Sequence, residues 1–187
     1  TRRHKNAWQR VEGLVVISEG LKFALVQNGV PEEKIWVARD AVDIKMFTVS
    51  ETRDECRKKL HLPSEHKKIV VYTGHLYEWK GADLLAQASS IIKSDIHVYI
   101  VGGTEEDIKK FQTLYSAPNL HIVGWQPGQA IPYWLKAADL LVLPNSAKEK
   151  ISTLYTSPLK LFEYMASGTR TLLSDLPSIR EVAGEHG

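Results

Sequence analysis

The sequence predicts an α/β fold, a Rossmann-like parallel sheet with helices on both faces. Two observations support this prediction. Short apolar runs rich in β-branched residues alternate with helix-like stretches along most of the 187 residues, as in βαβ units. Each run is nearly continuous in apolar residues, as expected for strands that are covered on both sides. The expected strands are residues 14–18, 35–38, 69–73, 97–101, 120–123, 140–143 and 171–174.

The stretches between these runs carry the start and stop signals of helices. Ser18 stands at an N-cap position, and Asn28 and Gly29 follow the end of the same helix. Acidic residues fill the first turn of the stretch 104–115, where the helix dipole favours negative charge. The expected helices are residues 18–29, 50–60, 81–92, 104–115, 127–138 and 157–168.

The alternation is interrupted at residues 39–47, where a turn-like segment leads into a polar, charged helix. We therefore expect a domain boundary near residue 45, which divides the chain into residues 1–44 and 45–187. The chain opens without a methionine and closes as a helical segment begins. We expect it to be a piece of a longer protein.

Composition and charge exclude several classes of protein. With 43% hydrophobic and 25% charged residues, the chain has the composition of an ordinary globular protein. No run approaches the roughly 18 apolar residues of a membrane span. The formal net charge of +2 gives no general field for nucleic acid, so no nucleic-acid partner is expected. The one cysteine, Cys56, can form no internal disulfide and is expected on a helix surface, which fits a reducing compartment. Histidine and cysteine spacings match no metal motif, so no metal site is expected.

Ligands of open parallel sheets bind beyond the carboxyl ends of the strands, so the loops there are the candidate sites. The first loop, in "TGHLYEWKG", contains Gly74, His75, Lys80 and Gly81. A glycine-bounded loop that leads into a helix N-terminus and carries an ammonium suits a phosphate group. An ordinary strand-to-helix turn with a solvated Lys80 is the alternative, and spacing alone does not decide between them.

Two further loops reach the same edge of the sheet. In "VGWQPG", Gly124 permits close backbone approach and Trp125 offers a flat surface for a nucleobase, although Trp125 could equally pack against a helix. The long loop at residues 144–157 has no obvious structure, and loops of that length inside compact domains are usually functional or mobile. It delivers the N–H groups of the following helix turn to the same edge.

The helix at residues 157–168 combines an N-cap, Ser157, a proline at the first helical position, Pro158, and a glycine after its end, Gly168. It also carries one carboxylate, Glu163, whose two oxygens could accept from both hydroxyls of a ribose. A solvent-exposed pair with Lys160 at i,i+3 is the alternative. The residues expected to be buried are Leu159, Leu161, Phe162, Met165 and Ala166.

Three segments in this order, "YTGHLYEWKGADLL", "LHIVGWQPGQAIPYWLKAADLLVLPN" and "SPLKLFEYMASGTRTLLSDLPSIREV", resemble the donor-binding half of a GT-B glycosyltransferase of family four, also called group 1. The stretch 13–47 is similar to the end of such an enzyme's N-terminal domain and its linker. The resemblance implies that residues 1–44 are the tail of the acceptor domain. Residues 45–187 would be the nucleotide-sugar donor domain, truncated at its C-terminus.

The resemblance also implies roles for the matched residues. Lys80 would contact the donor diphosphate and Glu163 would hold the ribose diol, and these two are the expected catalytic residues. The remaining donor-binding positions are Gly74 and His75 at the diphosphate, Gly124 and Trp125 at the base, Tyr155 at the sugar, and Thr156, Ser157, Pro158 and Leu159 at the phosphate.

Two positions depart from the family pattern. His75 stands where arginine is common, and Tyr155 stands where the first glutamate of the E-x7-E motif is expected, eight residues before Glu163. A tyrosine offers one hydroxyl where a carboxylate grips the sugar with two oxygens. The departure leaves open which sugar is bound and whether the parent protein is fully active.

The resemblance implies a cytoplasmic retaining enzyme, independent of metal and cofactor, that moves a hexose from a UDP- or GDP-linked donor. The acceptor would be a glycan or a lipid-linked molecule, bound through the N-terminal domain, with peripheral membrane association of the parent left open. The chain alone should bind donor weakly and transfer nothing. A non-catalytic nucleotide-sugar-binding module and a GT-B-like sugar-nucleotide epimerase are the alternatives.

Overall fold

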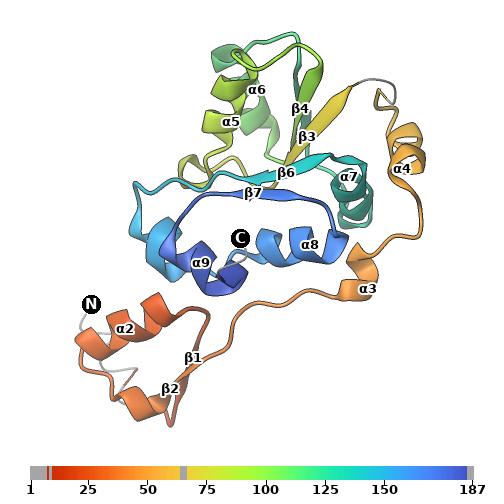
Figure 1. Cartoon of the computed structure of the whole chain (residues 1–187). Coiled ribbons are helices and arrows are strands. Elements are labelled where there is room, and N and C mark those ends of the chain that lie inside the picture. The colour runs from red at the N-terminus through yellow and green to blue at the C-terminus, as the bar shows by residue number, and fades with distance from the viewer. Residues whose placement is uncertain (1–7, 9, 64–66, 185–187) are drawn as a thin grey trace.

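The computed structural model describes residues 8, 10–63 and 67–184 and shows two parallel sheets (Figure 1). The smaller sheet pairs β1 (Leu14–Val16) with β2 (Ile35–Val37). The larger has the strand order β5-β4-β3-β6-β7. Its strands are β3 (Lys68–Thr73), β4 (Ile96–Val101), β5 (Leu120–Gly124), β6 (Leu140–Leu143) and β7 (Thr171–Leu173). Each expected strand is present and every pair is parallel, so the predicted fold class is confirmed.

Helices cover both faces of the larger sheet. Within the described residues, none is long and apolar enough to cross a bilayer. The α-helices are α2 (Glu19–Gln27), α3 (Ile44–Phe47), α4 (Arg53–Lys59), α5 (Ala82–Ser89), α6 (Glu105–Leu114), α7 (Ile131–Ala137), α8 (Leu159–Ser167) and α9 (Pro177–Ala183). Short 3-10 turns are η1 (Glu32–Lys34), η2 (Glu78–Lys80) and η3 (Gly128–Ala130), and η4 (Ile151–Tyr155) is a π-helical turn.

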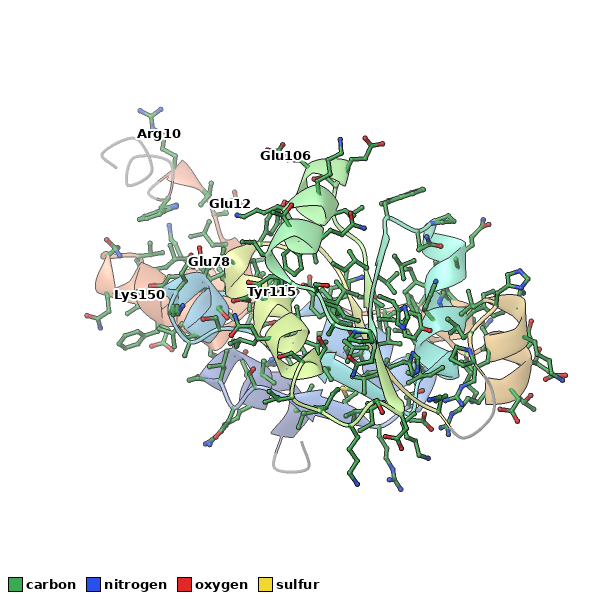
Figure 2. The ribbon with its side chains drawn as sticks, turned by 90° about the horizontal axis from the view of Figure 1, so that it is seen from above. Arg10, Glu12, Glu78, Glu106, Tyr115 and Lys150 are labelled. Atoms are coloured by element: carbon green, nitrogen blue, oxygen red, sulfur yellow. The ribbon has the colours of Figure 1, made fainter. Side chains whose placement is uncertain are left out.

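The period-two pattern of the strands divides the core into two layers. Ile69 and Val71 of β3 pack with α7, α8 and α9 on one face, whereas Tyr72 of the same strand packs with α5 and α6 on the other. Successive side chains of a strand point to opposite faces, so an apolar strand needs cover on both. The acidic first turn of α6 stays outside these layers, and Glu106 projects from the body of the protein (Figure 2).

The expectation that Cys56 lies on a helix surface is wrong, because its side chain is fully buried. The charged run that contains it forms α4, which packs against α7. The neighbouring Arg57 is buried as well, and its Nη2 lies 2.7 Å from Oδ2 of Asp139. Burial alone would raise the pKa of Asp139, but bonds from the Ile69 N–H and from Arg57 keep it below its ordinary value. A highly charged sequence can therefore still form a helix with one buried face.

The start of α8 also differs from the prediction. The N-cap is Pro158, not Ser157, and the Ser157 hydroxyl instead accepts a hydrogen bond from the Asp40 N–H at 3.1 Å. Leu159 and Met165 were expected to be buried but are 46% and 54% exposed. The helix packs the side that carries Leu161 and Tyr164 against the sheet. Which side is buried could not be predicted from the apolar residues alone, because apolar residues also occupy the exposed side.

One hydrogen bond ties α8 to the end of β3. β6 pairs with β3 only at Val70 and Val71, so the N–H of Thr73 on that side lies beyond the ladder. The Tyr164 hydroxyl accepts from it at 2.9 Å. Burial raises the pKa of Tyr164 to about 12, so the hydroxyl keeps its own proton near neutral pH. The bond fixes the helix at the point where the first candidate loop begins.

Tyr164→Phe should lower the free energy of unfolding by about 1–3 kcal/mol, because it leaves the buried Thr73 N–H without its acceptor. Urea unfolding followed by circular dichroism measures the change. The control is Tyr115→Phe at the end of α6, where a half-buried tyrosine should lose no more than about 0.5 kcal/mol. Equal stability of the two variants would contradict the structural role of the Tyr164 hydroxyl.

Two glycines with the same backbone conformation offer a second test. Gly81 before α5 has φ 72° and ψ 15°, and Gly168 after α8 has φ 67° and ψ 12°. A Cβ on Gly81 would lie 1.8 Å from the Pro144 carbonyl oxygen, whereas a Cβ on Gly168 meets nothing within 4 Å. Gly168→Ala should cost about 1–2 kcal/mol for the left-handed backbone alone. Gly81→Ala should cost about 4 kcal/mol or more in the same unfolding assay. Similar losses would show that the close approach at Pro144 relaxes freely.

Candidate functional site

Glycines at the carboxyl ends of three neighbouring strands let their loops pack backbone against backbone. Gly74 after β3, Gly102 after β4 and Gly124 at the end of β5 have φ values of 147°, 123° and 80°. The Gly102 N–H donates to the Gly124 carbonyl at 2.7 Å. A Cβ on Gly102 would lie 2.1 Å from the Gly74 carbonyl oxygen. Only glycine fits this arrangement, which lets the three loops lie close together at this edge of the sheet.

A hollow of about 340 Å³ lies beyond these strand ends, and we call it the strand-end cavity. It brings together parts of two predicted loops, since Gly74 and His75 line it with Trp125. Trp125 is 73% exposed, so the alternative that it packs against a helix is wrong. Gly124 has a packing role instead, because Ile108 Cδ1 lies 2.6 Å from the position of a Cβ.

A second hollow of about 320 Å³, the linker cavity, adjoins the first, and both are lined by Gly128, Ile131 and Lys160. Its other walls come from the linker segment 41–47 and from Leu159 and Glu163 of α8. Glu163 therefore borders a cavity at the edge of the sheet where the site was predicted, although the residue is only 7% exposed. A carboxylate so deeply placed requires a partner.

Lys160 is that partner. Its Nζ donates to Oε2 of Glu163 at 2.9 Å, so the i,i+3 pair considered from the sequence is present. The pair is not the solvent-exposed one of that alternative, because the Glu163 side chain is 9% exposed. Pairing with Lys160 and bordering the linker cavity are thus compatible properties of the same carboxylate.

Lys80 is the last residue of η2, directly before the left-handed Gly81 that leads into α5. Its Nζ lies 4.0 Å from the centroid of the Trp79 ring. Burial, followed by the positive charge of Lys160, lowers the pKa of Lys80 to about 8. The alternative of a freely solvated Lys80 is therefore wrong. Through Lys160, which acts on Lys80 and contacts Glu163, the two expected catalytic residues belong to one cluster of charges.

The segment directly before α8, residues 155–158, does not line either of these two cavities. Tyr155 lines a third hollow of about 540 Å³ between α2 and η4, together with Phe23 and Leu154. Thr156 is half-buried, and Ser157 and Pro158 are buried. The structure thus brings Gly74, His75, Trp125, Leu159 and Glu163 to two adjoining cavities. Tyr155 lines the third hollow instead, and neither Lys80 nor Gly124 is among the lining residues of the two cavities. The roles expected for residues 155–158 stay predictions.

Sequence reasoning missed two parts of this site. Gly102 and Gly103 line the strand-end cavity, and the glycine pair directly after an expected strand was the available signal. Lys160 was considered only as a partner of Glu163, although it borders both cavities. No spacing rule reveals such a position, because it depends on how α8 sits against the glycine loops.

Comparison with known proteins identifies the family. The family described as "Glycosyl transferases group 1" matches residues 67–187. The amylovoran biosynthesis glycosyltransferase AmsK of Erwinia amylovora is 26% identical over 189 residues, which cover 96% of this chain and 44% of that protein. The chain spans less than half the length of this curated relative.

Solved structures agree in fold. HepE of Anabaena, crystallised with UDP and glucose, superimposes with a TM-score of 0.75 at 19% identity, over 94% of this chain and 47% of that one. WaaG, a glycosyltransferase involved in lipopolysaccharide biosynthesis, gives a TM-score of 0.71 at 17% identity, over 97% and 51% of the two chains. The chain belongs to the group 1 glycosyltransferase family and has the Rossmann-like architecture of GT-B glycosyltransferases.

Proposed function

We propose that this chain is the donor-binding part of a retaining glycosyltransferase that transfers a hexose from a UDP- or GDP-sugar without a metal ion or cofactor. The observation that carries the proposal is the pair of Lys160 and Glu163 that lines the two cavities, together with Lys80, which is near enough for the charge of Lys160 to lower its pKa. It combines positive charge for a diphosphate with a carboxylate for a ribose diol at one edge of the sheet. The HepE structure, of similar fold, contains UDP and glucose, which supports a nucleotide-sugar ligand.

The diphosphate is proposed to occupy the strand-end cavity. Gly74 and Gly102 keep its floor free of side chains, and His75 and Lys160 lie in its wall. As the bond to the sugar breaks, negative charge grows on the departing nucleoside diphosphate. A positive side chain already in place, Lys80, stabilises that charge without rearranging solvent.

The nucleoside is proposed to lie across the two cavities. Glu163 borders the linker cavity and would accept hydrogen bonds from the two ribose hydroxyls. The exposed ring of Trp125 provides an apolar surface for the base. This placement gives the carboxylate of α8 a role beyond its ion pair with Lys160.

The rest of the reaction is proposed to need a second domain. Residues 1–44 would be the tail of an acceptor domain and residues 45–187 the donor domain, with a glycan or lipid-linked acceptor bound outside this chain. Tyr155 would face the sugar from η4, which packs against α2 of the first part. The parent enzyme would act in the cytoplasm, and this chain alone would bind donor and transfer nothing.

Binding of UDP or GDP should depend on Lys80 and Glu163. Lys80→Ala and Glu163→Gln should each weaken the preferred nucleotide about 10- to 100-fold, because each removes a charge-assisted contact of about 1.5–3 kcal/mol. Calorimetric titration of the purified chain measures this. Lys109→Ala and Glu106→Gln, exposed changes on α6, are the matched controls and should bind as the unmodified chain does. Absence of nucleotide binding, or full affinity in both site variants, would contradict the proposal.

Nucleotide affinity should also fall at alkaline pH. The pKa of Lys80 is lowered to about 8, so the ammonium is present below that pH and lost as the pH rises through it. Affinity for UDP should therefore decrease between pH 7.5 and 9.5, approaching about tenfold per pH unit at the alkaline end. Lys80→Arg should flatten the profile, since arginine stays charged. A flat profile in the unmodified chain would show that the Lys80 ammonium does not meet the phosphate.

A further inference from the structure

Lys160 occupies a position that the proposed function does not explain by itself. It stands in the first turn of α8 and lines both the strand-end cavity and the linker cavity. Its Cε lies 3.8 Å from the position of a Cβ on Gly74, so its stem runs beside the glycine loop after β3. Its amine ends on Oε2 of Glu163 at 2.9 Å. The side chain therefore connects the place proposed for the diphosphate with the place proposed for the ribose.

We propose that Lys160 is a further donor-binding residue that exchanges partners: it holds Glu163 in the empty site and turns to the diphosphate when the nucleotide binds. The inference rests on the proposed function, because it requires the diphosphate in the strand-end cavity and the ribose at Glu163. It adds a second ammonium to Lys80 for the phosphate oxygens. It also makes occupation of the two cavities interdependent.

The burial of the pair favours such an exchange. The Lys160 side chain is 28% exposed and the Glu163 side chain only 9%, so the carboxylate is the deeper member and the amine the more accessible one. A buried carboxylate needs a hydrogen-bond donor at all times. In the empty site that donor is Lys160, and the ribose hydroxyls can replace it. A lysine stem is long and flexible enough to move its amine without moving the helix.

The charges of the cluster point the same way. Lys80 and Lys160 repel each other, and the charge of Lys160 contributes to the lowered pKa of Lys80. Lys160 contacts the carboxylate of Glu163 and its positive charge acts on Lys80, so two lysines and one glutamate leave an excess of positive charge. A nucleoside diphosphate carries more than one negative charge and can engage both amines at once. A free nucleoside offers Lys160 no phosphate, so its ribose hydroxyls have to compete with the amine for Glu163.

The test separates a phosphate contact from a mere support of Glu163. In a Glu163→Gln background the buried carboxylate is gone, so a lysine that only neutralises it has no further task. Lys160→Met keeps the stem length and removes the amine. We expect Lys160→Met in the Glu163→Gln background to weaken UDP at least 10-fold and to change uridine less than twofold. Calorimetry measures UDP binding, and chemical-shift titration measures the weaker uridine.

The single variants test the exchange itself. In Lys160→Met with Glu163 intact, UDP should weaken at least 10-fold while uridine binds as well as before or more tightly, because Glu163 no longer has to release an amine. Lys80→Met should weaken UDP and leave uridine unchanged. Lys109→Met on α6 should affect neither ligand. Thermal unfolding of each variant establishes that it is folded. GDP and guanosine replace UDP and uridine if the chain selects guanine.

The outcomes distinguish the two proposals. If the unmodified chain binds neither UDP nor GDP, the proposed function fails and this inference fails with it. If UDP binds but Lys160→Met leaves its affinity unchanged in the Glu163→Gln background, Lys160 only supports Glu163 and the inference alone is wrong. Equal weakening of UDP and uridine by Lys160→Met, in either background, would also overturn it, because the amine would then not act through the phosphate.

Discussion

The geometry of the candidate site depends on the hydrogen bond between the Tyr164 hydroxyl and the Thr73 N–H. Strand β6 does not pair with that N–H, and Tyr164, which follows Glu163 in α8, supplies the acceptor. The helix that carries Lys160 and Glu163 is thereby held against the strand whose loop carries His75 and Lys80. Because Tyr164 is fully buried, the bond is protected from competing water. Together with the packing of Leu161 in the core, it sets the position of the α8 charges relative to the loop after β3.

Much of the fold was predictable, because each strand needed only a local signal. The apolar runs located all seven expected strands, and Gly168 ends α8 in the left-handed conformation as expected. The errors concern which side of a helix is buried. Cys56 lies inside because α4 packs on α7, and Leu159 lies outside because α8 is oriented by Tyr164. Such orientation is decided by a partner element far away in the chain, which periodicity does not contain.

The candidate site was predictable in its location but not in its charges. The rule that ligands bind at the carboxyl ends of parallel strands, with the glycines there, indicated the correct edge. The resemblance singled out Lys80 and Glu163, but the sequence left open whether either was merely solvated. Burial and proximity decide that question, since Lys80 has a lowered pKa and Glu163 is held by Lys160. Those properties arise only when β3, η2 and α8 come together.

The linker cavity adds a constraint from the other end of the chain. The Asp40 N–H donates to the buried Ser157 hydroxyl, and Arg39 pairs with Glu181 of α9 at 2.9 Å. These contacts hold the segment after β2 beside α8, where its continuation lines the same cavity as Glu163. The Arg39 guanidinium contacts Oε1 of Glu181 through both Nε and Nη2, and the Glu181 side chain is only 15% exposed. The bond from Asp40 engages the Ser157 hydroxyl, which explains why that serine does not cap the helix. The surroundings of Glu163 are therefore set jointly by α8 and by the chain that precedes residue 45.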